Sequence, residues 1–115
     1  MHDRARQLLI QLVNAPESLS RNRHFSLFEE SRARHLRRRA SHLRALRDAL
    51  LNEEATLERI KSSQYRTMLR LTYASGAVQR TWLSNDELSV LAAAVWPEAP
   101  PALRAQFEGE APPKL

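Results

Sequence analysis

A dense run of basic side chains occupies the middle of the sequence. From residue 32 to residue 47 there are seven arginines, two histidines and no acidic residue. The arginines are Arg32, Arg34, Arg37, Arg38, Arg39, Arg44 and Arg47. Guanidinium groups form paired hydrogen bonds with phosphates and carboxylates alike, so the run can bind nucleic acid or an acidic protein surface. The common alternative is a solvated helix face with weak local ion pairs, such as Glu30–Arg34 and Arg44–Asp48.

Leucines recur every seventh residue through the same stretch. The four are Leu36, Leu43, Leu50 and Leu57. Leu46 and Ile60 lie three residues beyond two of them, which gives part of a coiled-coil seam. This spacing favours packing against a second helix, either on a partner or dimer mate or within the same chain. Arg32, Arg39 and Glu53 fall at seam positions and argue against a simple parallel zipper, because a buried unpaired charge is costly.

The two patterns together predict a partner-binding site on one helix. Its apolar part is predicted to be Leu36, Leu43, Leu46 and Leu50, and its basic part Arg37, Arg39, Arg44 and Arg47. The leucines would bury apolar area in a partner groove or dimer seam, and the arginines would select a partner with acidic rims. The rival hypothesis is a nucleic-acid-binding regulator that uses the arginine-rich helix face, with affinity that falls steeply as salt rises.

Several features weigh against the nucleic-acid hypothesis. Aromatic residues make up only 6% of the chain, so no stacking platform is evident. There is no zinc-finger spacing, and no glycine-containing turn precedes the arginine-rich helix. The basic residues are interleaved with the leucines, whereas a bZIP protein places its basic region before the zipper.

Catalytic and metal-binding patterns are missing from the sequence. His35 and His42 share a helix face but lie about 10 Å apart, too far for one metal ion. The adjacent acids Glu53–Glu54 and Asp86–Glu87 point in diverging directions on a helix. There is no cysteine, glycine-rich phosphate loop or nucleophile elbow. We therefore expect no enzyme activity, no cofactor and no metal site.

The first half of the chain is predicted to be helical. An apolar stripe over residues 2–14 predicts a first helix, and the polar residues 17–24 predict a loop. Residues 26 to about 62 contain neither glycine nor proline and are rich in strong helix formers. An unbroken helix of that length would be roughly 50 Å long, so it either breaks near Asn52–Glu53 or projects from the domain.

A β-hairpin is predicted at about residues 65–83. Apolar and polar residues alternate over 65–73, and Ser75–Gly76 is a turn signal before a second run at 77–83. A two-residue loop would pair Tyr73 with Val78 and Leu69 with Trp82. The tryptophan is then expected in the core between the hairpin and the last helix.

A capping box predicts where the last helix begins. Ser84 with Glu87 three residues later favours a start at this point, and Pro97 ends the helix after Trp96. Trp96 is expected in the core, with a partner anchor as the alternative. Residues 97–115 hold five of the six prolines and are predicted to form a flexible tail, with a possible short turn at 102–107.

These elements predict an α+β fold that is mainly α. It would have a long central helix, shorter flanking helices and one β-hairpin, in a single domain over 1–96 followed by the proline-rich tail at 97–115. The 115-residue chain carries a net charge of +5 and has a modest core, which favours a homodimer. Without a secretion signal or an apolar run near 20 residues, we expect a cytoplasmic protein with no membrane partner.

One known family has a similar layout. The pair Phe25 and Phe28, the arginine-rich helix over 32–47 with its leucine stripe, and the hairpin from Leu69 to Trp82 resemble the QslA-type quorum-sensing anti-activators of pseudomonads. The similarity covers size, composition and element order over most of the chain. It implies a protein that binds the ligand-binding domain of a LuxR-type transcription factor through its long helix and prevents that factor from dimerising.

Overall fold

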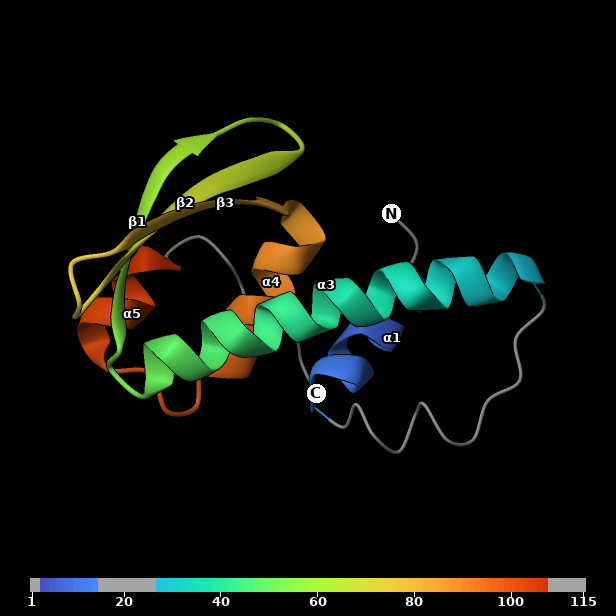
Figure 1. The fold of residues 1–115 in the computed structure, drawn as a ribbon, viewed down its shortest axis with the longest axis horizontal. Helices are drawn as coiled ribbons and strands as arrows, with labels where there is room; N and C mark the ends of the chain where they lie inside the picture. The colour runs from blue at the N-terminus through green and yellow to red at the C-terminus, as the bar shows by residue number, and fades with distance from the viewer. Residues whose placement is uncertain (1–2, 15–26, 108–115) are drawn as a thin grey trace. The chain divides into compact units, whose positions relative to one another are not determined.

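The computed structural model describes residues 3–14 and 27–107 (Figure 1). The elements, in chain order, are α1 (Asp3–Asn14), α3 (Leu27–Leu51), β1 (Ala55–Ser62), β2 (Arg66–Tyr73), β3 (Val78–Ser84), α4 (Asn85–Val95) and α5 (Pro101–Gln106). They fall into two compact units, Met1–Ala45 and Leu46–Leu115, where we expected one domain over 1–96 and a tail. The fold is mixed α+β, as predicted. The expected loop at 17–24 lies outside the described residues.

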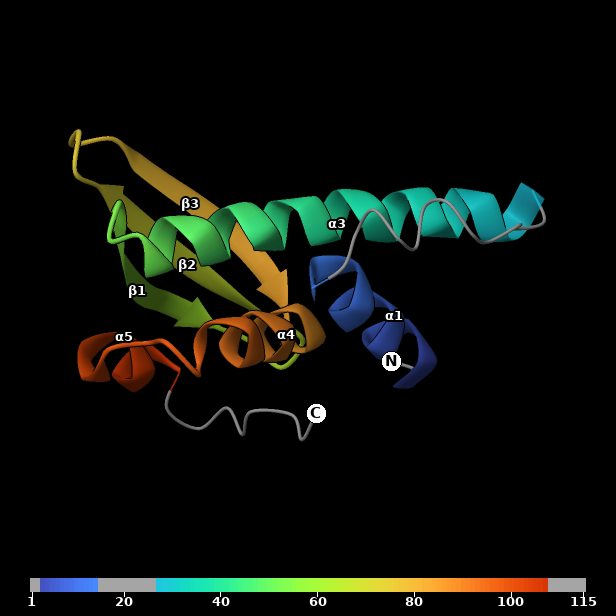
Figure 2. The same ribbon diagram turned by 90° about the horizontal axis from the view of Figure 1, so that it is seen from below.

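The first unit contains α1 and the part of α3 up to Ala45. The predicted first helix is confirmed, and the two helices lie side by side in both views (Figures 1 and 2). Apolar residues spaced three or four apart are buried on each helix, as expected of amphipathic helices. They are Leu9, Leu12 and Val13 on α1, and Leu36, Ala40 and Leu43 on α3.

The end of α3 is set by backbone hydrogen bonds at Asn52–Glu53, so the structure shows the first of the two alternatives, a break near this point rather than a projecting helix. The amide of Glu54 donates to the carbonyl of Ala49 at 2.9 Å, and that of Glu53 donates to the carbonyl of Leu50 at 3.4 Å. This is the Schellman pattern, which requires a left-handed residue just beyond the helix. Glu53 supplies it with φ of 59° in place of the usual glycine.

The segment after this turn corrects the sequence-based prediction. Residues 55–62 were predicted to be helical, whether or not the helix broke before them, but they form strand β1. Ala55 and Leu57 are buried while Thr56 and Glu58 are exposed, a period of two that suits a strand with one covered face. Leu57 and Ile60 therefore do not belong to a helical seam. With a third strand present, the description "mainly α with one hairpin" is also too helical.

The three strands form one antiparallel sheet in the order β1-β2-β3. The β2–β3 hairpin is confirmed, but its predicted register is wrong by one residue, because Met68 pairs with Trp82 and Thr72 with Val78. The amide of Gly76 donates to the carbonyl of Tyr73, and that of Tyr73 to the carbonyl of Ala77, both at 2.8 Å. Gly76 has φ of 92°, which fits a three-residue loop ending in a left-handed residue.

The register error matters because a shift of one residue moves side chains to the opposite face. In the observed register, Leu57, Leu69, Leu71 and Leu83 lie on one face and are buried. Trp82, paired with Met68, lies on the other face. We refer to these as the covered face and the open face of the sheet.

Helices α4 and α5 pack on the covered face of the sheet. The capping box is confirmed: the Glu87 amide donates to Ser84 Oγ at 3.2 Å, and the Ser84 amide donates to Glu87 Oε1 at 2.9 Å. Helix α4 packs on β2 and β3, and α5 packs on β1, on the same side of the sheet (Figure 1). Their buried apolar residues complete the core of this unit.

Residues 97–107 are ordered parts of the second unit rather than the flexible tail that the prolines suggested. Pro101 begins α5, where its missing N–H has no helical partner to lose. Leu103 and Phe107 are buried, and Arg59 Nη1 donates to the carbonyl of Gln106 at 3.5 Å. Residues 108–115 lie outside the described part. Among the described helices, none is long and apolar enough to cross a bilayer.

Candidate functional site

The predicted site lies on α3, and the structure separates its apolar and basic parts. Arg34, Ser41 and Ala45 are exposed, as is Arg38, and together they follow one side of the helix. Arg37 and Arg44 border this side and are half-buried. We call Arg34, Arg37, Arg38 and Arg44 the arginine face; at 100° per residue it lies opposite the leucine stripe. All four belong to the first unit.

The leucines of the predicted site are buried in the chain itself. Leu36 is 9% exposed, Leu43 0%, Leu46 2% and Leu50 4%. The structure therefore favours the alternative in which the stripe packs within the chain. A docking role for these leucines would require them to leave their present positions.

The remaining predicted arginines differ in their surroundings. Arg47 Nε donates to Asp48 Oδ1 at 3.0 Å, so Asp48 pairs with its neighbour instead of with Arg44. Arg39 is half-buried at the edge of the leucine stripe and also makes polar or charged contacts. Arg44 Nε is buried and has no hydrogen-bond partner among the described residues. A buried donor in this state is costly, so an added acceptor would be favourable there.

The histidines do not form a metal site in the described residues. His35 is exposed and His42 is half-buried and engaged in contacts of its own. No group of three or more His, Cys, Asp or Glu residues in the described part could hold one ion. The polar groups gathered on α3 suit binding of anions through guanidinium groups.

A second group of basic residues, which the sequence patterns did not predict as a site, lies on the open face of the sheet. Strand pairing sets Glu58, Arg70 and Arg80 in one row across β1, β2 and β3. Lys61, Met68 and Trp82 form the neighbouring row, and Arg66 follows on β2. The sequence did not predict this group for two reasons. Residues of β1 were expected to be helical, and the wrong hairpin register placed Trp82 opposite Leu69.

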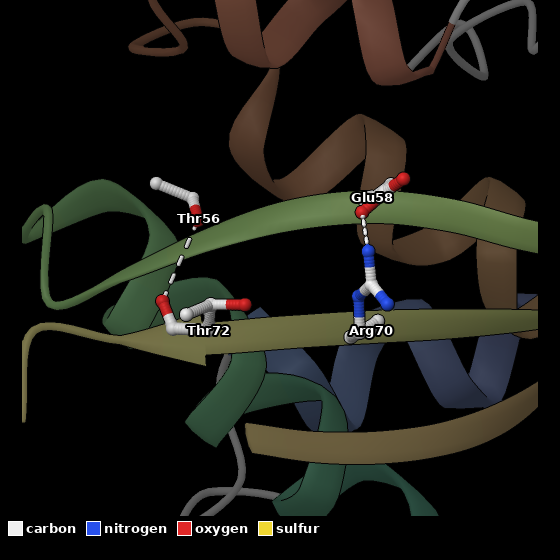
Figure 3. A network of polar contacts seen from close by, with 4 residues as sticks. All are labelled: Thr56, Glu58, Arg70 and Thr72. Carbon is white, nitrogen blue, oxygen red and sulfur yellow. Dashed lines mark hydrogen bonds and ion pairs between the residues drawn. The ribbon is translucent and has the colours of Figure 1, made fainter. Parts of the chain in front are cut away.

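The contacts on the open face are unequal. Arg70 Nη2 forms an ion pair with Glu58 Oε2 across β1 and β2, beside the Thr56 hydroxyl that donates to the carbonyl of Thr72 (Figure 3). Arg80 lies opposite Arg70 on the other side and has no ion pair among the described residues. The guanidinium carbon of Arg66 lies 4.1 Å from the centroid of the Trp82 ring.

Comparisons with known proteins give no information on the function. No protein-family model, curated protein or solved structure matches this chain. The function is therefore inferred from the two basic surfaces, namely the arginine face of α3 and the open face of the sheet.

Proposed function

We propose that this protein is a non-catalytic regulator that binds an acidic surface of a partner protein through the arginine face of α3. The observation that carries the proposal is the division of α3 into two sides. The leucines are buried, which fixes the helix, and the opposite side presents arginines in a stretch that contains no acid from residue 32 to residue 47.

The roles of the site residues follow from this division. Leu36, Leu43, Leu46 and Leu50 hold the helix in place, while the arginines make the contact and accelerate encounter with an acidic partner. Arg39 lies at the edge of the leucine stripe and Arg47 pairs with Asp48, so neither belongs to the arginine face. A partner carboxylate that reached Arg44 Nε would satisfy the donor that now has no acceptor.

The partner proposed first is a transcription factor of the LuxR type. The resemblance to quorum-sensing anti-activators supports this choice, and it implies that binding blocks dimerisation of the factor. Such inhibition needs no chemistry, because a protein that binds only the monomer shifts the equilibrium by mass action. The proposal also includes a cytoplasmic location and a homodimer, the latter because the core of a small chain is modest.

Charge reversal on the arginine face tests the proposal. The double variant Arg34→Glu/Arg38→Glu changes two exposed side chains, so the fold should be retained. Calorimetric titration against the purified ligand-binding domain of a LuxR-type factor should show affinity at least about ten-fold weaker than for the unaltered protein. Arg104→Glu, an exposed arginine on α5 in the other unit, is the matched control. Equal affinity for all three proteins would contradict the assignment of the site.

A second candidate function is binding of duplex nucleic acid through the same face. It is favoured by the absence of acidic residues between residues 32 and 47, because an acid there would repel phosphates. Anisotropy of a labelled DNA duplex, measured at low and near-physiological salt, separates the candidates. Micromolar binding that collapses as salt rises, and that Arg37→Glu/Arg38→Glu abolishes, would support the duplex. No binding at near-physiological salt would leave the protein partner.

A further inference from the structure

The open face of the sheet carries more positive charge than its own contacts use. Four basic residues face outward on the strands, Lys61, Arg66, Arg70 and Arg80, against one acid, Glu58. Glu58 forms an ion pair with Arg70 (Figure 3). The remaining three cations have no acid on this face, so the surface is suited to an anionic ligand.

The row across the middle of the open face is unfavourable for the isolated chain. Arg70 and Arg80 are direct cross-strand partners, and like charges in that relation destabilise a sheet. A fold that needed only stability would place an acid or a neutral residue at position 80, where the side chain is exposed. Two guanidinium groups held at adjacent positions could instead contact successive phosphates of one nucleic-acid strand.

One flat pair lies among these charges. Arg66 is stacked over Trp82, which holds its planar guanidinium against an aromatic ring. Tyr65 precedes Arg66 in the turn between β1 and β2 and is 74% exposed. Exposed aromatic rings and guanidinium planes are the groups on which unpaired bases stack.

We propose that the open face of the sheet binds single-stranded nucleic acid. Phosphates would be bound by Arg80 and Lys61, which have no acid on this face, with Arg70 beside them in its ion pair with Glu58, and bases would stack on Tyr65 and on the Arg66–Trp82 pair. A duplex fits this arrangement less well, because its bases are already stacked and cannot reach these groups. An acidic polypeptide would satisfy the charges but would leave the stacking groups without a use. This surface lies in the second unit and is independent of the arginine face of α3.

The test uses the full chain and a labelled oligothymidylate of about twelve nucleotides, within the site sizes that such surfaces cover. Fluorescence anisotropy at low and near-physiological salt gives the affinity and its salt dependence, with a duplex of the same length and poly-glutamate as competitors. We expect the single strand to bind, and both competitors to displace it poorly. Tyr65→Ala, which changes a largely exposed residue, should weaken binding by about ten-fold.

Two arginine variants form a matched pair. Arg66→Gln removes the arginine stacked on Trp82, and Arg104→Gln removes the arginine that lies 5.1 Å from the ring of Trp96 on the helical side of the same unit. Both lose one charge and one cation–ring contact. Only Arg66→Gln should weaken the oligonucleotide complex, by about ten-fold. Circular dichroism of each variant shows whether the fold is retained.

Four outcomes would overturn the proposal. They are no binding at low salt, equal affinity for single strand and duplex, displacement by poly-glutamate as effective as by unlabelled single strand, and equal losses for Arg66→Gln and Arg104→Gln. The arginine-face variant Arg34→Glu/Arg38→Glu separates this test from that of the proposed function. If it abolishes oligonucleotide binding while Tyr65→Ala leaves it unchanged, the nucleic-acid site is on α3 and the sheet proposal is wrong.

Discussion

The two faces of the sheet are built from the same three strands, yet they carry different kinds of side chain. On the covered face, Leu57 pairs with Leu71, Leu69 and Leu83 lie beside them, and α4 and α5 pack over this face. On the open face, the middle row holds Glu58, Arg70 and Arg80, and the rows beside it mix threonine, lysine and apolar residues. Neighbouring residues of a strand point to opposite sides of the sheet, so one strand can supply leucines to the covered face and polar residues to the open face.

The difference teaches which residues are needed for folding and which are available for binding. The covered face is held by burial, so its side chains are fixed by volume and shape. The open face carries the Glu58–Arg70 ion pair, the Arg66–Trp82 contact and Arg80, which has no ion pair within the described part of the chain. Its composition is poorly explained by stability and is better explained by a ligand.

The largest expected effect comes from the covered face. Leu69 is 0% exposed at the centre of β2, so Leu69→Ala removes buried methyl groups and leaves a cavity. The free energy of unfolding should fall by about 3 kcal/mol, measured by urea denaturation. Met68→Ala is the matched control, because Met68 is the preceding residue and lies on the open face, half-buried. Met68→Ala should lower the free energy of unfolding by less than half as much. Equal decreases for the two variants would contradict the assignment of the two faces.

A smaller effect is expected at the start of α4, the helix that covers β2 and β3. Ser84→Ala removes the acceptor of the Glu87 amide and one half of the capping box. The free energy of unfolding should fall by about 1 kcal/mol. Ser75→Ala, in the exposed β2–β3 loop, is the control and should change stability much less. A loss as large for Ser75→Ala would show that the capping contact is not the source.

Local signals predicted the start of α4 and the existence of the hairpin, because each is decided by a few neighbouring residues. The capping box at Ser84 is an example, whereas the register of the hairpin was predicted wrongly and the break at Asn52–Glu53 was one of two alternatives. Strand β1 was not predicted because its residues include good helix formers, and its strand conformation depends on pairing with β2. Tertiary context overrides local preference in such segments.

The two candidate sites also differ in how far the sequence predicts them. The arginine face of α3 could be predicted because a helix of known period places residues relative to one another. The open face could not, because Glu58, Arg70 and Arg80 come together only through the register of three strands. Gly76 sets one of these registers by allowing a three-residue loop, whereas Ser75–Gly76 read alone suggested a two-residue loop.

The smallest expected change in stability, and the sharpest test of the comparison, concerns Arg80. Arg80→Glu replaces a like-charge pair with an opposite-charge pair against Arg70, on a row that already contains Glu58. The free energy of unfolding should rise by about 0.5 kcal/mol at low salt, and the gain should shrink as salt screens the pair.

The same variant should bind the oligothymidylate more weakly, because it places a carboxylate where a phosphate is expected. Stability and binding would then move in opposite directions at one exposed position. Arg80→Gln, which removes the repulsion without adding an acid, should give a smaller gain in stability and a smaller loss of binding. If Arg80→Glu destabilised the protein, Arg80 would have a structural role, and the contrast between a face for folding and a face for binding would fail at this residue.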